Sequence, residues 1–155
     1  LTWAKTLDAV AVTLNKGSAL AQQGKLAEAH EVFEEIRDLI EDLQTRNGVV
    51  TFSVRMNAFH HQMEEVLKNK YDGFSPGGLG ELREDAALLA YLGMQLRKFP
   101  PPEAAGTPEF DDVLRAALDS VSAIQTAARA GDAARAKEAL AKLKPAYSRL
   151  FLRFG

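Results

Sequence analysis

Apolar residues recur every three to four positions in each segment of this chain that lies between glycine or proline breaks. This spacing places apolar side chains on one side of an α-helix and does not fit the alternation of a β-strand. The chain is therefore expected to be all-α. The pattern predicts six helices, over about residues 2–23, 25–47, 51–70, 81–99, 109–130 and 132–154, with loops at 71–80 and 100–108.

Pro145 lies inside the last of these predicted helices. A proline removes one backbone hydrogen bond and crowds the preceding turn, so it kinks or breaks a helix. Here the apolar stripe keeps its phase on both sides of the proline. We therefore expect a kinked but continuous helix, with Pro145 on the side that faces water.

The two ends of the chain resemble each other. Residues 19–48 match residues 126–155 with a constant offset of 107, and glycines fall in register at both Gly24/Gly131 and Gly48/Gly155. The apolar positions coincide as well, pairing Ala29 with Ala136, Phe33 with Leu140, Ile36 with Leu143 and Leu43 with Leu150. Both ends are thus predicted to be α-hairpins, which make antiparallel neighbours.

Two such hairpins facing each other would form an up-and-down four-helix bundle. We predict a single helical domain over residues 1–155, built from a hairpin at 2–48, middle helices at 51–99 and a hairpin at 109–154. In this arrangement the two middle helices extend or cap the bundle.

The charges of the two end hairpins are opposite. Residues 28–42 carry seven acidic side chains and one arginine, whereas residues 129–155 carry seven basic and two acidic side chains. Attraction between the two hairpins explains this, although exposed ion pairs contribute at most ~1 kcal/mol each. Alternatively, the basic last helix docks an acidic partner protein. A homodimer is also compatible with the pattern.

Composition excludes several classes of function. The net charge of −2 leaves no strongly basic surface for nucleic acid, and no apolar run reaches the ~20 residues of a membrane span. The absence of cysteine excludes thiolate metal sites, cysteine nucleophiles and covalently attached haem. No nucleophile–base constellation is visible, so we expect no enzymatic activity. Because the sequence begins at Leu1, we expect a mature or trimmed form whose targeting peptide would lie upstream.

A histidine–methionine cluster is the one candidate site. Met56, His60 and Met63 share one side of the predicted helix at 51–70, and Glu64 follows His60 by one turn. Two thioethers and an imidazole suit copper, with Glu64 or His30 completing the set. The predicted site is therefore Met56, His60, Met63 and Glu64, for copper or another transition metal. The alternative is that the methionines fill the core and His60 is a core histidine.

Residues 127–154, which read AARAGDAARAKEALAKLKPAYSRLFLRF, resemble the last helix pair of the cytochrome c′ family. That family continues into a CxxCH haem attachment, but the corresponding positions here are Tyr147, Leu150 and Phe151. The resemblance implies a haem-less relative with a four-helix bundle fold and a bacterial periplasmic location. It implies no electron transfer, because both thioether positions and the axial histidine are missing.

Residues 16–36 are instead similar to a tetratricopeptide motif, with Gly17, Gly24, Ala29 and Phe33 at its packing positions. This resemblance implies a protein-interaction module with a concave groove. However, the tetratricopeptide repeat recurs every ~34 residues, whereas the offset here is 107, and a solenoid needs about three copies. We therefore keep a tetratricopeptide-like interaction module as the alternative to a non-enzymatic periplasmic bundle.

Overall fold

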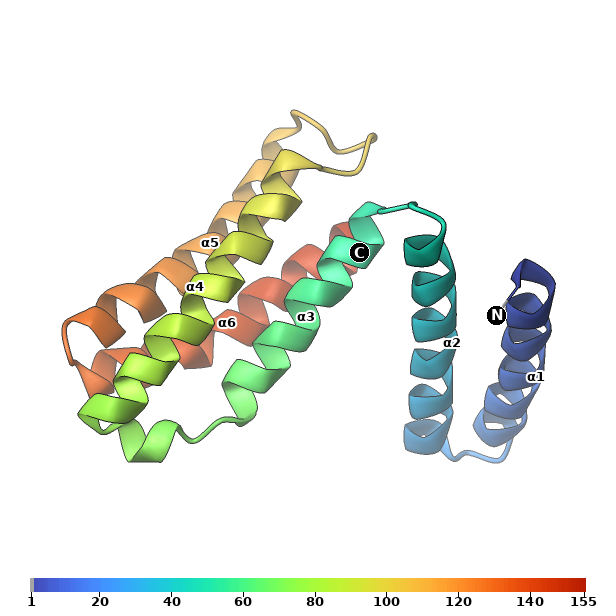
Figure 1. The fold of residues 1–155 in the computed structure, drawn as a ribbon, viewed down its shortest axis with the longest axis horizontal. Coiled ribbons are helices and arrows are strands. Elements are labelled where there is room, and N and C mark those ends of the chain that lie inside the picture. Colours follow the sequence, from blue (N-terminus) through green and yellow to red (C-terminus); the bar gives the residue numbers. More distant parts are fainter. Residues whose placement is uncertain (1) are drawn as a thin grey trace. The chain divides into compact units, whose positions relative to one another are not determined.

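The structure is a computed structural model that describes residues 2–155, and it is all-helical, as the sequence predicts (Figure 1). The elements in chain order are α1 (Trp3–Gln22), α2 (Leu26–Arg46), α3 (Phe52–Lys68), the short 3₁₀ helix η1 (Tyr71–Phe74), α4 (Pro76–Lys98), α5 (Pro108–Arg129) and α6 (Ala133–Phe154). No helix among these residues is both long enough and apolar enough to cross a membrane.

Side-chain caps begin five of the six α-helices. A hydroxyl or carboxylate accepts the backbone N–H three residues further on, which satisfies one of the free donors of the first turn. The capping residues are Thr2, Thr51, Ser75, Thr107 and Asp132. Gly24 and Gly131 close the two end hairpins with φ of +76° and +69°, a conformation that costs glycine little. These local signals explain why the sequence places most helix ends within two residues.

The start of α4 differs from the expectation of a loop over 71–80. Pro76 is the first helical residue, where its missing N–H costs nothing, and Ser75 caps the helix. Gly78 lies against the backbone carbonyl of Tyr71, so closely that a Cβ at this position would overlap the oxygen. The glycines that suggest a loop therefore belong to the first turn of α4, where Gly78 allows close packing against Tyr71.

The chain divides into two compact units, the first up to Val50 and the second from Thr51 to Gly155, where the sequence indicates one domain. The first unit is the α1–α2 hairpin. The second contains α3, η1, α4, α5 and α6, in which α3 contacts α4, α4 contacts α5, α5 contacts α6, and α6 returns to α3.

Helices α3 and α4 form one core with α5 and α6, which corrects the expected arrangement. The apolar sides of α5 and α6 are buried in a cluster to which α3 and α4 contribute. Its members include Met56, Phe59, Met63, Leu82, Leu89, Leu114, Val121, Leu143 and Leu150. The sequence analysis expected the hairpin at 2–48 to cover these stripes. Each stripe shows which side of a helix avoids water, but not which other helix it meets.

Helix α6 continues through Pro145, as predicted, and Pro145 is exposed to solvent. The apolar stripe of α6 remains buried on both sides of the proline, at Leu143 and Leu150.

Candidate functional site

The four residues of the predicted metal site all lie on α3, but in different surroundings. Met56 and Met63 are buried in the core of the second unit. His60 is partly exposed, and its ring stacks on that of Tyr147 from α6, with 5.4 Å between ring centroids. The methionine sulfurs and the imidazole therefore occupy the inner side of α3, as the spacing predicts.

Glu64 is engaged in an ion pair. Lys144 Nζ on α6 donates to Glu64 Oε1 at 2.8 Å, which ties α3 to α6. This hydrogen bond lowers the pKa of Glu64 below its ordinary value, and the charge of Lys144 lowers it further. Burial of the carboxylate acts in the opposite direction but does not cancel the shift. Metal coordination by Glu64 would have to compete with this pair.

Within the described part of the chain, no three histidine, aspartate or glutamate side chains gather as a metal site. His30, the alternative fourth ligand, is exposed on α2 in the first unit. A site at Met56, His60 and Met63 would thus depend on thioether ligands, and it stays a prediction.

Four of the six basic side chains of α6 pair with acidic side chains of the second unit. Arg153 pairs with Glu109 of α5, with Nε and Oε1 2.5 Å apart, and Lys142 pairs with Glu138 one turn away at 2.6 Å. Lys144 pairs with Glu64. These pairs account for much of the basic charge, which the sequence analysis had assigned to the acids of 28–42. Docking of an acidic partner protein at α6 stays a prediction.

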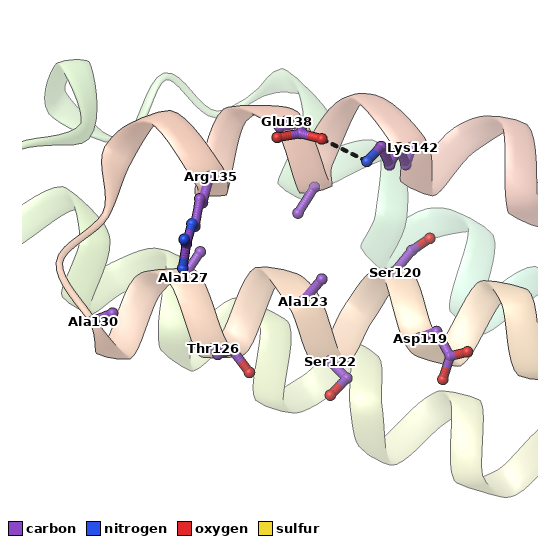
Figure 2. A pocket seen from close by; sticks show the side chains of 11 residues that line it. Asp119, Ser120, Ser122, Ala123, Thr126, Ala127, Ala130, Arg135, Glu138 and Lys142 are labelled. Atoms are coloured by element: carbon purple, nitrogen blue, oxygen red, sulfur yellow. Dashed lines mark hydrogen bonds and ion pairs between the residues drawn. The ribbon is translucent and has the colours of Figure 1, made fainter.

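A shallow groove of about 490 Å³ runs between α5 and α6 (Figure 2). It exists because small residues such as Ala123, Ala127 and Ala139 line the contact between the two helices. Lys142 donates to Glu138 along the α6 side of the groove, and Ser120 Oγ donates to the carbonyl of Ala116. Ser120, Arg135, Glu138 and Lys142 are thus bonded locally, and the geometry of the groove identifies no reaction.

The turn before α4 holds one buried polar group. Tyr71 is fully buried, and its hydroxyl donates to Asp85 Oδ2 at 2.8 Å. Burial first, and then the bond to Asp85, raise the pKa of Tyr71. Tyr71, Asp72 and Phe74 all have positive φ, which only a well-anchored turn maintains. This arrangement secures the start of α4.

The α1–α2 hairpin has an exposed apolar surface. Besides Val12, which lies on another side of α1, three large apolar residues of α1 and three of α2 are exposed, at Trp3, Leu7, Leu14, Leu26, Phe33 and Ile40. On each helix the three lie within about 40° of one another, immediately beside the side that contacts the other helix. Because α1 and α2 are antiparallel, both stripes fall on the same side of the hairpin. We call these six residues the hairpin face.

The hairpin α5–α6 has the same register, with the ends of α1 and α5 and the starts of α2 and α6 offset by 107 residues. At this offset, exposed positions of α1 correspond to buried positions of α5. Trp3, Leu7 and Leu14 are 52%, 53% and 49% exposed. Their counterparts Phe110, Leu114 and Val121 are only 2%, 1% and 1% exposed. Ile40 is likewise exposed where its counterpart, Tyr147, is buried.

In the second unit, α3 and α4 cover these positions. Phe110 packs edge-on against Phe52 of α3, and Tyr147 stacks on Phe59 of the same helix. Trp3 instead donates from its indole N–H to the side-chain oxygen of Asn47 at 3.3 Å. The sequence identifies the stripes on 2–48 as inward-facing. It does not show that the hairpin leaves them uncovered, because periodicity carries no information about what covers a stripe.

Comparison with protein-family models, with curated proteins and with solved structures found no match to this chain. The function is therefore argued from the geometry of the molecule.

Proposed function

We propose that this protein is a non-enzymatic helical protein that binds other helices through the hairpin face. The observation that carries this proposal is the difference between two hairpins of the same register. Four of the six positions of this face are buried at their counterparts on α5–α6, namely Phe110, Leu114, Val121 and Tyr147, whereas all six are exposed on α1–α2. Contiguous exposed apolar surface of this kind marks interaction sites.

The energetics of the first unit support the same function. Its buried residues are few, namely Thr6, Gly17, Ala29, Val32 and Leu43. Most of the stability of protein helices comes from tertiary packing of an apolar side, and two helices alone bury little of it. Covering the hairpin face would bury the remaining surface of six large side chains that are 38–70% exposed. Each would contribute roughly half of the ~1.5–3 kcal/mol that complete burial of such a side chain provides.

A site-specific photo-cross-linker tests this proposal in cells that contain the full chain. The cross-linking amino acid is placed at Leu14, on the hairpin face, or at Val12, which is exposed on the other side of α1. We expect a protein adduct from Leu14 and none from Val12, with the captured chain identified by mass spectrometry. Cross-links from Leu14 only to residues 51–155 of the same molecule, or none at all, would contradict the proposal.

A second candidate function is binding of a soft metal ion by Met56, His60 and Met63. The supporting observation is that all three lie on the inner side of α3. Titration with Cu(I) of protein purified without chelator tests it, after elemental analysis. We expect about one equivalent in the parent, its loss in His60→Ala and its retention in His61→Ala, since His61 is an exposed neighbour. A parent that binds no copper would refute this function.

The cellular location and the family resemblances also stay proposals. A periplasmic location, implied by the cytochrome c′ resemblance, requires that the gene encode a signal peptide upstream of Leu1. Sequencing of that region would test it. Binding through the hairpin face belongs to the same functional class as the tetratricopeptide alternative, but it uses a flat apolar side in place of a concave groove.

A further inference from the structure

We propose that Asn47–Gly48 is a site of self-modification, at which the Asn47 side chain loses ammonia when the α1–α2 hairpin opens, and that the product weakens the hairpin further. This reaction needs no enzyme and does not depend on what binds the hairpin face. It is supported by the sequence of the turn that ends α2, by the hydrogen bonds that hold this turn and by the small core of the first unit.

The chemistry follows from the sequence. Asn47 is the only asparagine of the chain that precedes a glycine, and glycine has no Cβ to hinder attack by its own nitrogen on the preceding side chain. The Gly48 nitrogen bonds to Asn47 Cγ and gives its proton to water, while the Cγ–Nδ2 bond breaks and Nδ2 leaves as ammonia. Water then opens the cyclic imide at either carbonyl and yields aspartate or isoaspartate. Water is the only co-reactant, and no oxidation or reduction takes place.

The folded hairpin holds the reacting atoms apart. Gly48 has φ of +71°, and its N–H donates to the carbonyl of Thr45 at 3.0 Å. The ψ of 12° at Asn47 turns the Gly48 nitrogen away from the Asn47 side chain. This side chain is itself fixed, because Nδ2 donates to the carbonyl of Leu43 at 2.7 Å and Oδ1 accepts the indole N–H of Trp3 at 3.3 Å. The turn must therefore rearrange before the ring can close.

The small core of the first unit makes such an opening accessible. Segments with few buried contacts open locally at a low cost in free energy. The residues buried by α1 and α2 are Thr6, Gly17, Ala29, Val32 and Leu43. When opening and closing are faster than ring closure, the rate of modification follows the fraction of time that the hairpin is open.

The product does not restore the turn. An aspartate at this position has no N–H to donate to the Leu43 carbonyl, and it places a negative charge at the C-terminal end of α2, where the helix dipole disfavours an anion. Isoaspartate adds a methylene group to the backbone and displaces the Val49 N–H that donates to the Gln44 carbonyl at 2.8 Å. Each modified chain therefore has a weaker hairpin, and modified chains accumulate with time.

Peptide mapping by mass spectrometry of the full chain, stored in mildly alkaline buffer, tests the inference. Exchange of the amide for an acid raises the mass of the tryptic peptide that begins at Asn47. A synthetic peptide of residues 41–53 gives the rate of a fully open turn. We expect Asn47 to react in the chain, but several-fold more slowly than in the peptide, while the asparagines that do not precede glycine stay unmodified.

Four variants separate opening of the hairpin from the chemistry. Leu43→Ala removes a buried side chain of α2 and should raise the rate toward that of the peptide. Trp3→Phe keeps an aromatic ring but removes the indole donor, and should raise the rate roughly twofold to fivefold. Val12→Thr is the control at an exposed position of α1 and should leave the rate unchanged. Gly48→Ala strains the turn at φ of +71°, yet it should slow the reaction because the new Cβ hinders ring closure.

Asn47→Asp reproduces one product. Trypsin should cleave this variant at Arg37, within α2, several-fold faster than the parent, and at Arg83 of α4 equally fast. Modification of the parent chain as fast as the peptide, no modification even in Leu43→Ala, faster modification in Gly48→Ala, or equal cleavage of Asn47→Asp and the parent at Arg37 would overturn the inference.

Discussion

At the scale of single residues, the start of α4 shows how a few atoms secure a turn. The Tyr71 hydroxyl is buried and bonded to Asp85, and the Tyr71 carbonyl packs directly against Gly78. Burial and the neighbouring carboxylate both oppose ionisation of the phenol and raise its pKa. Neither contact is visible as a motif, because Tyr71, Gly78 and Asp85 form no periodic pattern.

Replacing Tyr71 by Phe should remove one hydrogen bond and lower the free energy of unfolding by about 1 kcal/mol at pH 7.5. The raised pKa has a further consequence. Its stabilisation is complete below the unfolded-state pKa of about 10 and is lost as the pH rises above it. Between pH 9 and pH 11 the parent should therefore lose more stability than Tyr71→Phe, as measured by urea unfolding. Parallel losses in the two proteins would contradict this assignment.

Gly78→Ala should lower the free energy of unfolding by about 1–3 kcal/mol, because its new methyl group would overlap the Tyr71 carbonyl oxygen. Gly80→Ala is the matched control in the same helix. No atom lies within 4 Å of a Cβ at that position, so this change should raise stability by about 0.5–1 kcal/mol. Urea titrations would compare the two variants, and equal effects would argue against the close contact.

At the scale of elements, caps and helix-breaking residues determine where helices begin and end. Pro145 is an exception, because it lies inside α6 without ending the helix. Pro145 interrupts the hydrogen bonds of α6, yet the helix continues because Leu143 and Leu150 on either side are buried in the same core. The burial of these side chains offsets the lost backbone bond.

Pro145→Ala should therefore raise the free energy of unfolding by up to about 3 kcal/mol, since it restores a backbone donor at an exposed position without changing the core. Thermal and urea unfolding followed by circular dichroism would measure the gain. A loss of stability would show that the proline is required for the path of α6.

At the scale of the whole molecule, the two units differ in how completely they bury their apolar residues. The second has a core to which all four of its α-helices contribute. The first is a hairpin with an uncovered face.

Residues 51–155 should consequently fold without the hairpin. We expect this fragment to be helical and to unfold in one cooperative transition whose midpoint is independent of concentration. Residues 1–50 alone should be only weakly helical, because the two helices bury few residues against each other. Circular dichroism of each fragment at several concentrations would measure both. A fragment 51–155 without cooperative unfolding would show that the second unit depends on the first.

The sequence by itself determined the helices, most of their ends, the buried side of each and the shared register of the hairpins, because these depend on local hydrogen bonds, caps and apolar spacing. It placed Met56, His60 and Met63 together on the inner side of one helix for the same reason. Only the tertiary structure decided that α3 and α4 cover α5–α6, that Glu64 pairs with Lys144, and that the N-terminal hairpin keeps an open face. The choice among apolar stripes depends on how whole surfaces fit in size and charge, and a periodic pattern specifies that a stripe avoids water without specifying its partner.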